Sequence, residues 1–166
     1  DSVKLNDICS KIIRNTDDET IINDLIYFLS YSKMPALIEN QQDKIKTALP
    51  FLKIRSKNFY ELYKQSKFIL IKDIITLNEE SKELITNKNI LLIKALSEKL
   101  KNIKWAKDNI NKTIKSFALE NNKDFKDIAK LIRIAIVGSS NSPGIYDMMI
   151  VLGKMEVIRR FTILEI

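Results

Sequence analysis

The placement of glycine limits the folding of this chain more than any other feature, since only three glycines occur in 166 residues and all lie within residues 138–153. Gly138 follows an apolar run and can take the left-handed conformation that ends a helix. Ser142 and Pro143 then offer an N-cap and a first helical residue. Gly153 closes the short helix that follows. The order predicts a helix, a turn, a short helix, a second turn and a last helix.

Apolar residues recur at helical spacing along most of the remaining chain, whereas alternating strand patterns are scarce. Residues 16–19, Thr-Asp-Asp-Glu, form a capping box before one helix. Pro35 is expected to open the next helix and Pro50 to start or kink another. One long helix is expected from residue 78 to about residue 100. The pattern predicts an all-α fold, a cage or bundle of about eight or nine helices in two lobes.

The two lobes are expected to meet near residues 70–78, where the helical pattern is weakest. The apolar run at residues 68–71 is too short to distinguish helix from strand. We therefore predict an N-terminal helical lobe over residues 1–74 and a C-terminal lobe over residues 75–166.

Composition argues against a self-contained enzyme. The chain has no histidine, so it lacks the usual general base and the usual metal ligand. One cysteine, Cys9, cannot form a zinc cluster or an internal disulfide. No glycine-rich phosphate loop is present. No catalytic residue and no metal site are expected, and the absence of a signal peptide or membrane-length apolar run favours the cytoplasm.

Positive charge is concentrated after the first 50 residues. Residues 1–50 carry 6 basic and 8 acidic side chains, and residues 51–166 carry 22 and 13, which gives net charges of −2 and +9. The positive charge of residues 51–166 favours an anionic partner, most simply nucleic acid. A genome that uses lysine, isoleucine and asparagine freely would produce the same excess, so charge alone does not decide.

Arginine is scarce beside lysine, and a scarce arginine suggests a planar, bidentate role. Arg55 is one helical turn from Phe51 and from Phe59, so it is expected on a partly aromatic helix face. Arg133 lies in an apolar helix, where it either pairs with a buried carboxylate or points into a cleft. A snorkelling or ion-paired side chain is the alternative for both. Arg159 and Arg160 are expected in a solvated last turn of a helix, with phosphate contact as the alternative.

With these residues laid out, the last third of the chain resembles a C-terminal signature of bacterial glutamyl-tRNA synthetases. The family pattern is Leu-Arg-x-Ala-Leu-Thr-Gly, a short loop, Ser/Thr-Pro, a short helix, Leu-Gly-Lys and a last helix containing arginine. Residues 131–138 here read Leu-Ile-Arg-Ile-Ala-Ile-Val-Gly. The segment Phe51-Leu-Lys-Ile-Arg55 and Trp105 also agree with the family. Val137 departs from the usual threonine.

The resemblance implies an α-helical cage that receives the unstacked anticodon of a tRNA. It implies that Arg55 contacts the third anticodon base, a cytosine, and that Arg133 lies at the anticodon pocket. Ser142, Pro143 and Ile145 match the loop and helix start that contact the first two bases. The turns that let this backbone approach the RNA would be formed by Gly138, Gly144 and Gly153.

The family's catalytic motifs do not occur in this sequence, and a start at Asp1 suits an excised domain. The resemblance implies no cofactor in this chain and ATP and Mg²⁺ for the parent glutamate–tRNA ligase. It implies a monomer whose partner is tRNA(Glu), and it leaves open whether tRNA(Gln) is also charged. The anticodon domain of a class I lysyl-tRNA synthetase and a non-catalytic helical interaction domain are the alternatives.

Overall fold

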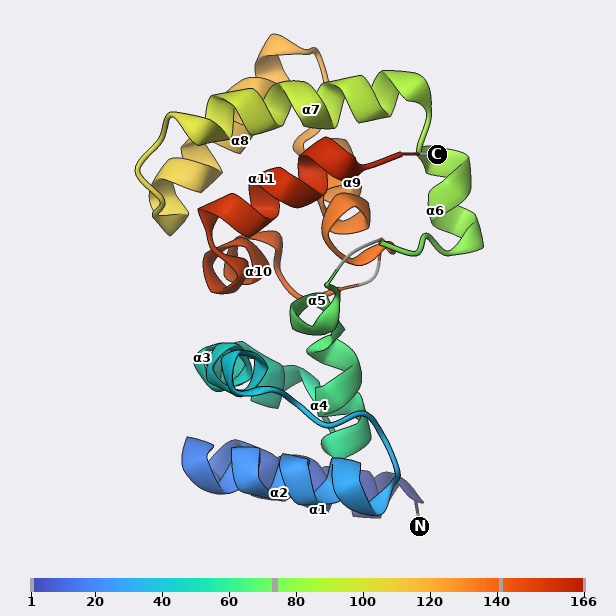
Figure 1. Cartoon of the computed structure of the whole chain (residues 1–166), viewed down its shortest axis with the longest axis vertical. Coiled ribbons are helices and arrows are strands. Elements are labelled where there is room, and N and C mark those ends of the chain that lie inside the picture. The colour runs from blue at the N-terminus through green and yellow to red at the C-terminus, as the bar shows by residue number, and fades with distance from the viewer. Residues whose placement is uncertain (1, 73–74, 141, 166) are drawn as a thin grey trace. The chain divides into compact units, whose positions relative to one another are not determined.

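The computed structural model describes residues 2–72, 75–140 and 142–165. Over these ranges the chain forms eleven helices and no strand, so the predicted all-α class is confirmed (Figure 1). None of these helices has the length and apolar character needed to cross a membrane. The helices are α1 (Ser2–Asn15), α2 (Asp18–Tyr31), α3 (Glu39–Arg55), α4 (Phe59–Gln65), α5 (Lys67–Leu70), α6 (Glu79–Leu84), α7 (Asn87–Lys101), α8 (Lys107–Glu120), α9 (Phe125–Val137), α10 (Ile145–Leu152) and α11 (Lys154–Ile163).

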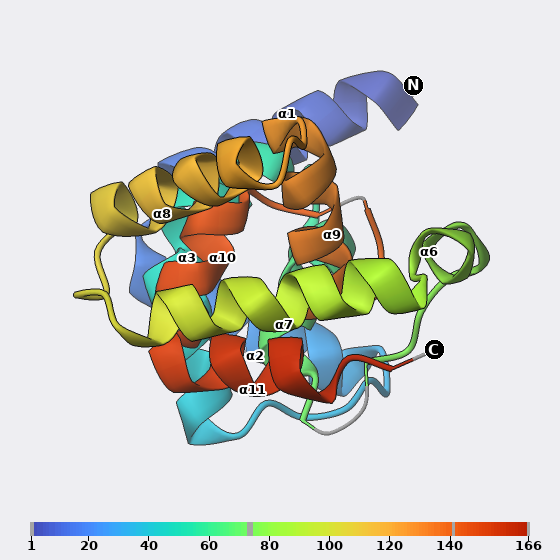
Figure 2. The same ribbon diagram turned by 90° about the horizontal axis from the view of Figure 1, so that it is seen from above.

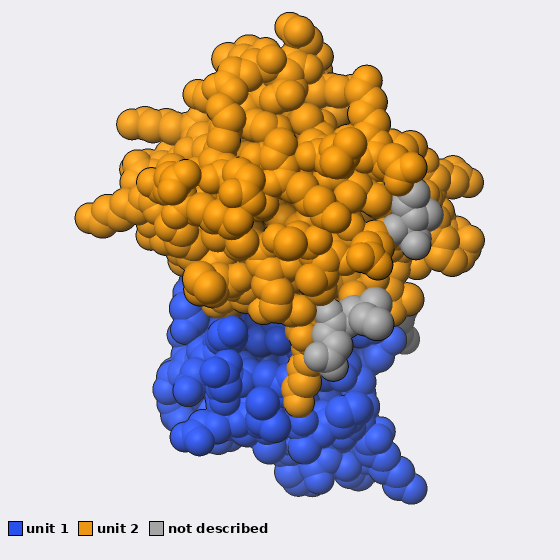
Figure 3. Space-filling model, turned by 45° about the horizontal axis from the view of Figure 1, so that its top comes forward, with its two compact units in different colours: residues 1–70 blue, residues 71–166 orange. Residues whose placement is uncertain are grey.

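The chain divides into two compact units, residues 1–70 and residues 71–166 (Figure 3). The lobe boundary predicted between residues 74 and 75 borders residues 73 and 74, which lie outside the described residues. Each unit has its own apolar core.

The first unit is built on α2 and α3, which pack against each other, with α1 and α4 also against α3. The apolar run whose structure the sequence left open is the short helix α5. The side chains that form the core of this unit are fully or almost fully buried: Ile21, Leu25, Leu29, Ile45, Leu49, Leu52, Leu62 and Phe68.

The start of α2 differs from the predicted capping box. Asp17, in an extended conformation, is the N-cap, and its carboxylate accepts a hydrogen bond from the Thr20 amide at 2.9 Å. The Thr16 hydroxyl instead donates to the Ile12 carbonyl at 2.8 Å. Thr16 is therefore engaged by the end of α1, and the next acceptor side chain along the chain caps α2.

Neither Pro35 nor Pro50 begins a helix, which corrects the start predicted at Pro35 and the first of the two alternatives for Pro50. Pro35 lies in a non-helical connection, and α3 begins four residues later at Glu39. There the Gln41 side chain accepts from the Ile38 amide at 3.1 Å and so supports the helix start. Pro50 lies inside α3, which continues to Arg55.

The second unit is centred on α9, whose apolar face is buried by its neighbours. Helices α7 and α11 lie side by side in both ribbon views (Figures 1 and 2). The core of this unit includes Ile93, Leu96, Leu100, Ile110, Ile114, Ile128, Ile132, Ala135, Met148, Met149, Val157 and Phe161.

The long helix expected over residues 78–100 is two helices, α6 and α7. The Thr86 hydroxyl caps α7 by accepting from the Asn89 amide at 3.3 Å, and the Asn89 side chain donates to the Leu84 carbonyl at 2.7 Å. Each of these two local bonds satisfies one backbone group at the break, the first at the start of α7 and the second at the end of α6. They also let Ile85 turn into the core, where it is 2% exposed.

Candidate functional site

Arg55 is the last residue of α3 and is exposed. The helix ends because Ser56 is extended, with φ −112° and ψ 131°, so Phe59 belongs to α4 and does not continue the face of Arg55. Within the described ranges the Arg55 guanidinium has no hydrogen bond or ion pair. The neighbouring carbonyl of Ile54 accepts from Arg14 Nη2 at 3.2 Å, which brings a second cation to this helix end.

Arg133 lies in α9 and is half-buried between residues whose side chains enter the core. No described carboxylate pairs with it, and its guanidinium has no hydrogen bond to the residues the structure describes. The donors of this guanidinium are therefore available to a group outside the chain.

Gly138 ends α9 in the left-handed conformation, with φ 80°, and its amide donates to the Ile134 carbonyl at 2.8 Å. The space beside its Cα is filled by protein, because a Cβ at this position would stand 2.1 Å from the Thr76 carbonyl oxygen. The Asn78 amide donates to the Gly138 carbonyl at 3.0 Å. The missing side chain thus admits the backbone of residues 76–78.

The loop before α10 differs from its predicted capping pattern. Helix α10 begins at Ile145 with Gly144 as N-cap, so Pro143 precedes the helix. The Ser142 hydroxyl donates to the Pro143 carbonyl at 3.2 Å instead of capping an amide. Pro143 and Ile145 are buried, and Ser142 is half-buried. Of these three residues, Ser142 therefore offers its hydroxyl, whereas Pro143 and Ile145 offer only backbone groups.

Gly153 joins α10 to α11. It has φ 81° and ψ 160°, and its amide donates to the Met149 carbonyl at 3.1 Å. No atom within 4 Å would meet an added Cβ, so the backbone conformation alone accounts for glycine here.

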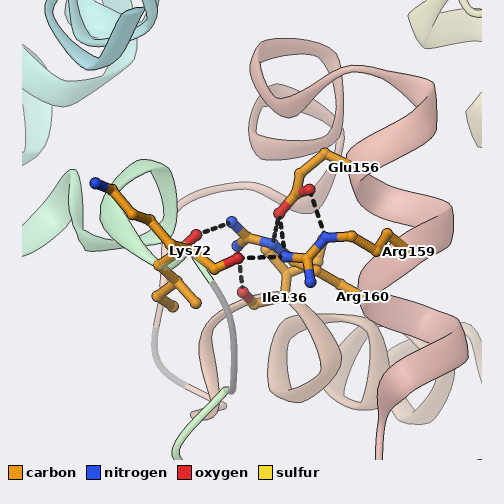
Figure 4. Close-up of polar contacts among 6 residues, drawn as sticks. Lys72, Ile136, Glu156, Arg159 and Arg160 are labelled. Atoms are coloured by element: carbon orange, nitrogen blue, oxygen red, sulfur yellow. Dashed lines mark hydrogen bonds and ion pairs between the residues drawn. The ribbon is translucent and has the colours of Figure 1, made fainter. Parts of the chain in front are cut away.

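Arg160 contradicts the expectation of a solvated helix end, because it is only 1% exposed. Figure 4 shows its polar contacts. Its Nε donates to Glu156 Oε1 at 2.7 Å, its Nη1 to the Ile136 carbonyl at 2.7 Å and its Nη2 to the Ile71 carbonyl at 3.0 Å. Burial lowers the pKa of this guanidinium, and Glu156 opposes that shift. The residue is thus a buried structural cation.

Arg159 lies beside it and binds the same carboxylate. Its Nε and Nη2 each donate to Glu156 at 2.8 Å, and Nη2 also donates to the Lys72 carbonyl at 2.9 Å. Burial raises the pKa of Glu156, but hydrogen bonds from the two arginines outweigh burial and lower that pKa to about 2. The sequence interpretation missed Glu156, although its spacing of four residues from Arg160 was a usable signal.

The described residues contain no group of three or more acidic, cysteine or histidine side chains able to hold a metal ion. Several acidic side chains instead pair with a lysine, as Glu80 does with Lys130 at 3.1 Å.

Comparison with known proteins gives the family. Residues 21–164 match the family model described as an anticodon binding domain. The chain belongs to the anticodon binding domain family. This finding confirms the family expected from the sequence.

Curated relatives of this anticodon binding domain are similar over almost its whole length. A glutamate–tRNA ligase of Cereibacter sphaeroides is 28% identical over 160 residues, which are 96% of this chain and 34% of that protein. The ligase of Nitrobacter hamburgensis is 31% identical over 166 residues, with 96% and 35% covered. The chain thus spans about a third of the length of these relatives, whose names agree with the resemblance found in the sequence.

Solved structures show the same fold. A glutamate tRNA ligase from Elizabethkingia meningosepticum, in complex with its amino acid, superposes with a TM-score of 0.75 at 17% identity. The superposition covers 94% of this anticodon binding domain and 30% of that chain.

Proposed function

We propose that this anticodon binding domain selects tRNA for a class I glutamate–tRNA ligase by binding the anticodon of tRNA(Glu). The observation that carries the proposal is the match of residues 21–164 to the family, together with the ligase relatives. The net charge of +7 agrees with an RNA partner.

Two arginines are the side chains we assign to base recognition. Arg14, Arg159 and Arg160 donate to protein acceptors, whereas Arg55 and Arg133 have no such bond within the described ranges. Unstacked bases in an RNA loop present Watson–Crick edges that a guanidinium can reach. Each arginine is proposed to donate to one such edge, Arg55 to the cytosine at the third position.

The loop before α10 is proposed to read the first two bases. Ser142 contributes its hydroxyl, which can rotate away from the adjacent carbonyl. Pro143 and Ile145 contribute backbone groups, because their side chains are buried. Gly144 keeps this backbone open to close approach.

Glutamylation itself is assigned to a part of the parent enzyme outside these 166 residues. That part would supply the ATP and Mg²⁺ chemistry. We also propose that the parent enzyme is cytoplasmic and monomeric. Whether it charges tRNA(Gln) as well is tested by the stem-loop binding experiment below.

The proposal is tested by measuring binding of an anticodon stem-loop of tRNA(Glu) and of the same stem-loop with one anticodon base replaced. Arg55→Ala and Arg133→Ala should each weaken cognate binding by about 1–3 kcal/mol, with a much smaller effect on the altered RNA. The exposed Lys64 and Lys115, which have no ion pair among the described residues, provide charge-matched controls as alanine variants.

Equal losses of binding free energy on both RNAs would indicate that the arginines contact phosphate and not a base. A dissociation constant independent of salt would contradict RNA binding altogether and favour a helical protein-interaction domain. Stronger binding to a stem-loop with a lysine anticodon would identify the lysyl-tRNA synthetase alternative, and a glutamine anticodon tests the tRNA(Gln) question.

A further inference from the structure

The buried side chain of Arg160 ties three parts of the second unit together. It leaves α11 and reaches the carboxylate of Glu156, the end of α9 and the start of the segment that enters this unit (Figure 4). Replacement of a buried ion pair by apolar side chains of similar volume is often neutral or stabilising. Such a pair is therefore better suited to fixing one backbone arrangement than to adding stability.

The contact to α9 is made at the point where that helix has spare acceptors. Ile136 lies in the last turn, where carbonyls have no amide partner within the helix. Arg160 Nη1 supplies a donor at 2.7 Å, and a cation is favourable at this end of the helix dipole. The guanidinium thus defines where the last turn of α9 lies.

The segment that enters the second unit is held against the same helix end. The carbonyls of Ile71 and Lys72 accept hydrogen bonds from Arg160 and Arg159. Further along, the Asn78 amide bonds the Gly138 carbonyl, and the Thr76 carbonyl occupies the space beside Gly138. Residues 76–78 therefore contact the end of α9 directly, and Ile71 is linked to it through Arg160.

The loop that follows Gly138 depends on this anchored end. The Ser140 hydroxyl donates to Glu80 at 3.2 Å, which adds one more tie to α6. Beyond it, the Ser142 hydroxyl bonds only the adjacent Pro143 carbonyl among the described residues. In the chain, Ser142 therefore lies between the anchored end of α9 and the start of α10.

We propose that Glu156, acting through Arg160, is a positioning residue for anticodon reading. It holds the guanidinium that fixes the end of α9, so that Arg133 and Ser142 meet a base in one geometry. This inference rests on the proposed function. Small displacements of recognition groups reduce selectivity far more than they reduce general attraction to phosphate.

The test measures the ratio of dissociation constants for the altered and cognate anticodon stem-loops, at a temperature where circular dichroism shows each variant folded. Glu156→Gln keeps the side-chain shape and removes the charge, and it should lower this ratio by about three- to tenfold. Arg159→Met removes the more exposed part of the network and should lower the ratio to a smaller extent, which keeps the test decisive if Glu156→Gln fails to fold.

The matched control is Ile114→Val, a core change in α8 that reduces stability without touching these hydrogen bonds. It should leave the ratio unchanged. An unchanged ratio in the folded Glu156 variant, or in the Arg159 variant if the first does not fold, would overturn the inference while leaving the proposed function intact. If the wild-type protein binds the altered and cognate stem-loops with nearly equal dissociation constants, both the proposed function and this inference are contradicted.

Discussion

The carbonyl oxygen of Thr76 occupies the position next to Gly138 that a side chain would need, only 2.1 Å from an ideal Cβ. Gly138 also has φ 80°, so two independent constraints require glycine. The contact brings the segment before α6 against the end of α9, where the candidate RNA-reading loop begins.

Gly138→Ala should therefore destabilise the protein strongly. The left-handed backbone costs about 1–2 kcal/mol for a residue with a Cβ, and the clash with backbone adds to that cost. Gly144→Ala is the comparison, because its φ is −59° and its nearest contact is the movable end of the Asp147 side chain. Urea unfolding should show a loss above about 2 kcal/mol for the first variant and below about 1 kcal/mol for the second. Similar losses would contradict the close approach of Thr76.

Glu156 should make stability depend on acid pH. Its pKa is about 2 in the folded protein against an ordinary value of 4.5, so the unfolded chain binds the proton more readily. The stabilising contribution is complete above about pH 5 and is lost as pH falls from 4.5 toward 2. After allowance for solvent screening, it amounts to about 1–2 kcal/mol. The difference in unfolding free energy between wild type and Glu156→Gln should shrink between pH 7 and pH 3, and a constant difference would contradict this account.

Asp17 and Thr16, which are adjacent at the start of α2, should differ in their contribution to thermal stability. Asp17→Ala removes the acceptor of the Thr20 amide and should lower the melting temperature by a few degrees. Thr16→Ala removes only a bond from a hydroxyl to the Ile12 carbonyl and should lower it less. Thermal unfolding followed by circular dichroism checks the order, and the reverse order would restore Thr16 as the cap.

Substitutions in and next to the loop before α10 should affect RNA recognition and core packing separately. Ser142→Ala removes an accessible hydroxyl and is expected to reduce selectivity for the cognate anticodon stem-loop. Ile145→Val trims a side chain that is 3% exposed and should cost about 0.5–1.5 kcal/mol of stability with selectivity preserved. Binding and urea unfolding of both variants test the distinction. Loss of selectivity in Ile145→Val alone would mean that its side chain, and not its backbone, governs recognition.

Local patterns in the sequence were sufficient for most of the helices and for their interruption at Gly138 and Gly153, but not for the break between α6 and α7. Helical periodicity depends on which residues face a core, and a glycine with positive φ ends a helix whatever surrounds it. The same local reasoning failed for Pro35 and Thr16, because several adjacent residues could each begin a helix. The side chain that finds a donor or acceptor in the fold decides between them.

The sequence by itself determined the all-α class, the order of the main helices and the family, since these depend on spacing and on residues adjacent in the chain. Only the tertiary structure decided which arginines have bonding partners within the protein. Arg160 is buried because Ile71, Ile136 and Glu156 meet around it, whereas Arg55 and Arg133 have no bonding partner in the described part of the chain. These arginines carry the same charge, and the sequence sets Arg160 apart only by the glutamate four residues before it. Their difference arises from carbonyls that come from distant segments, and folding alone brings those carbonyls within hydrogen-bonding distance.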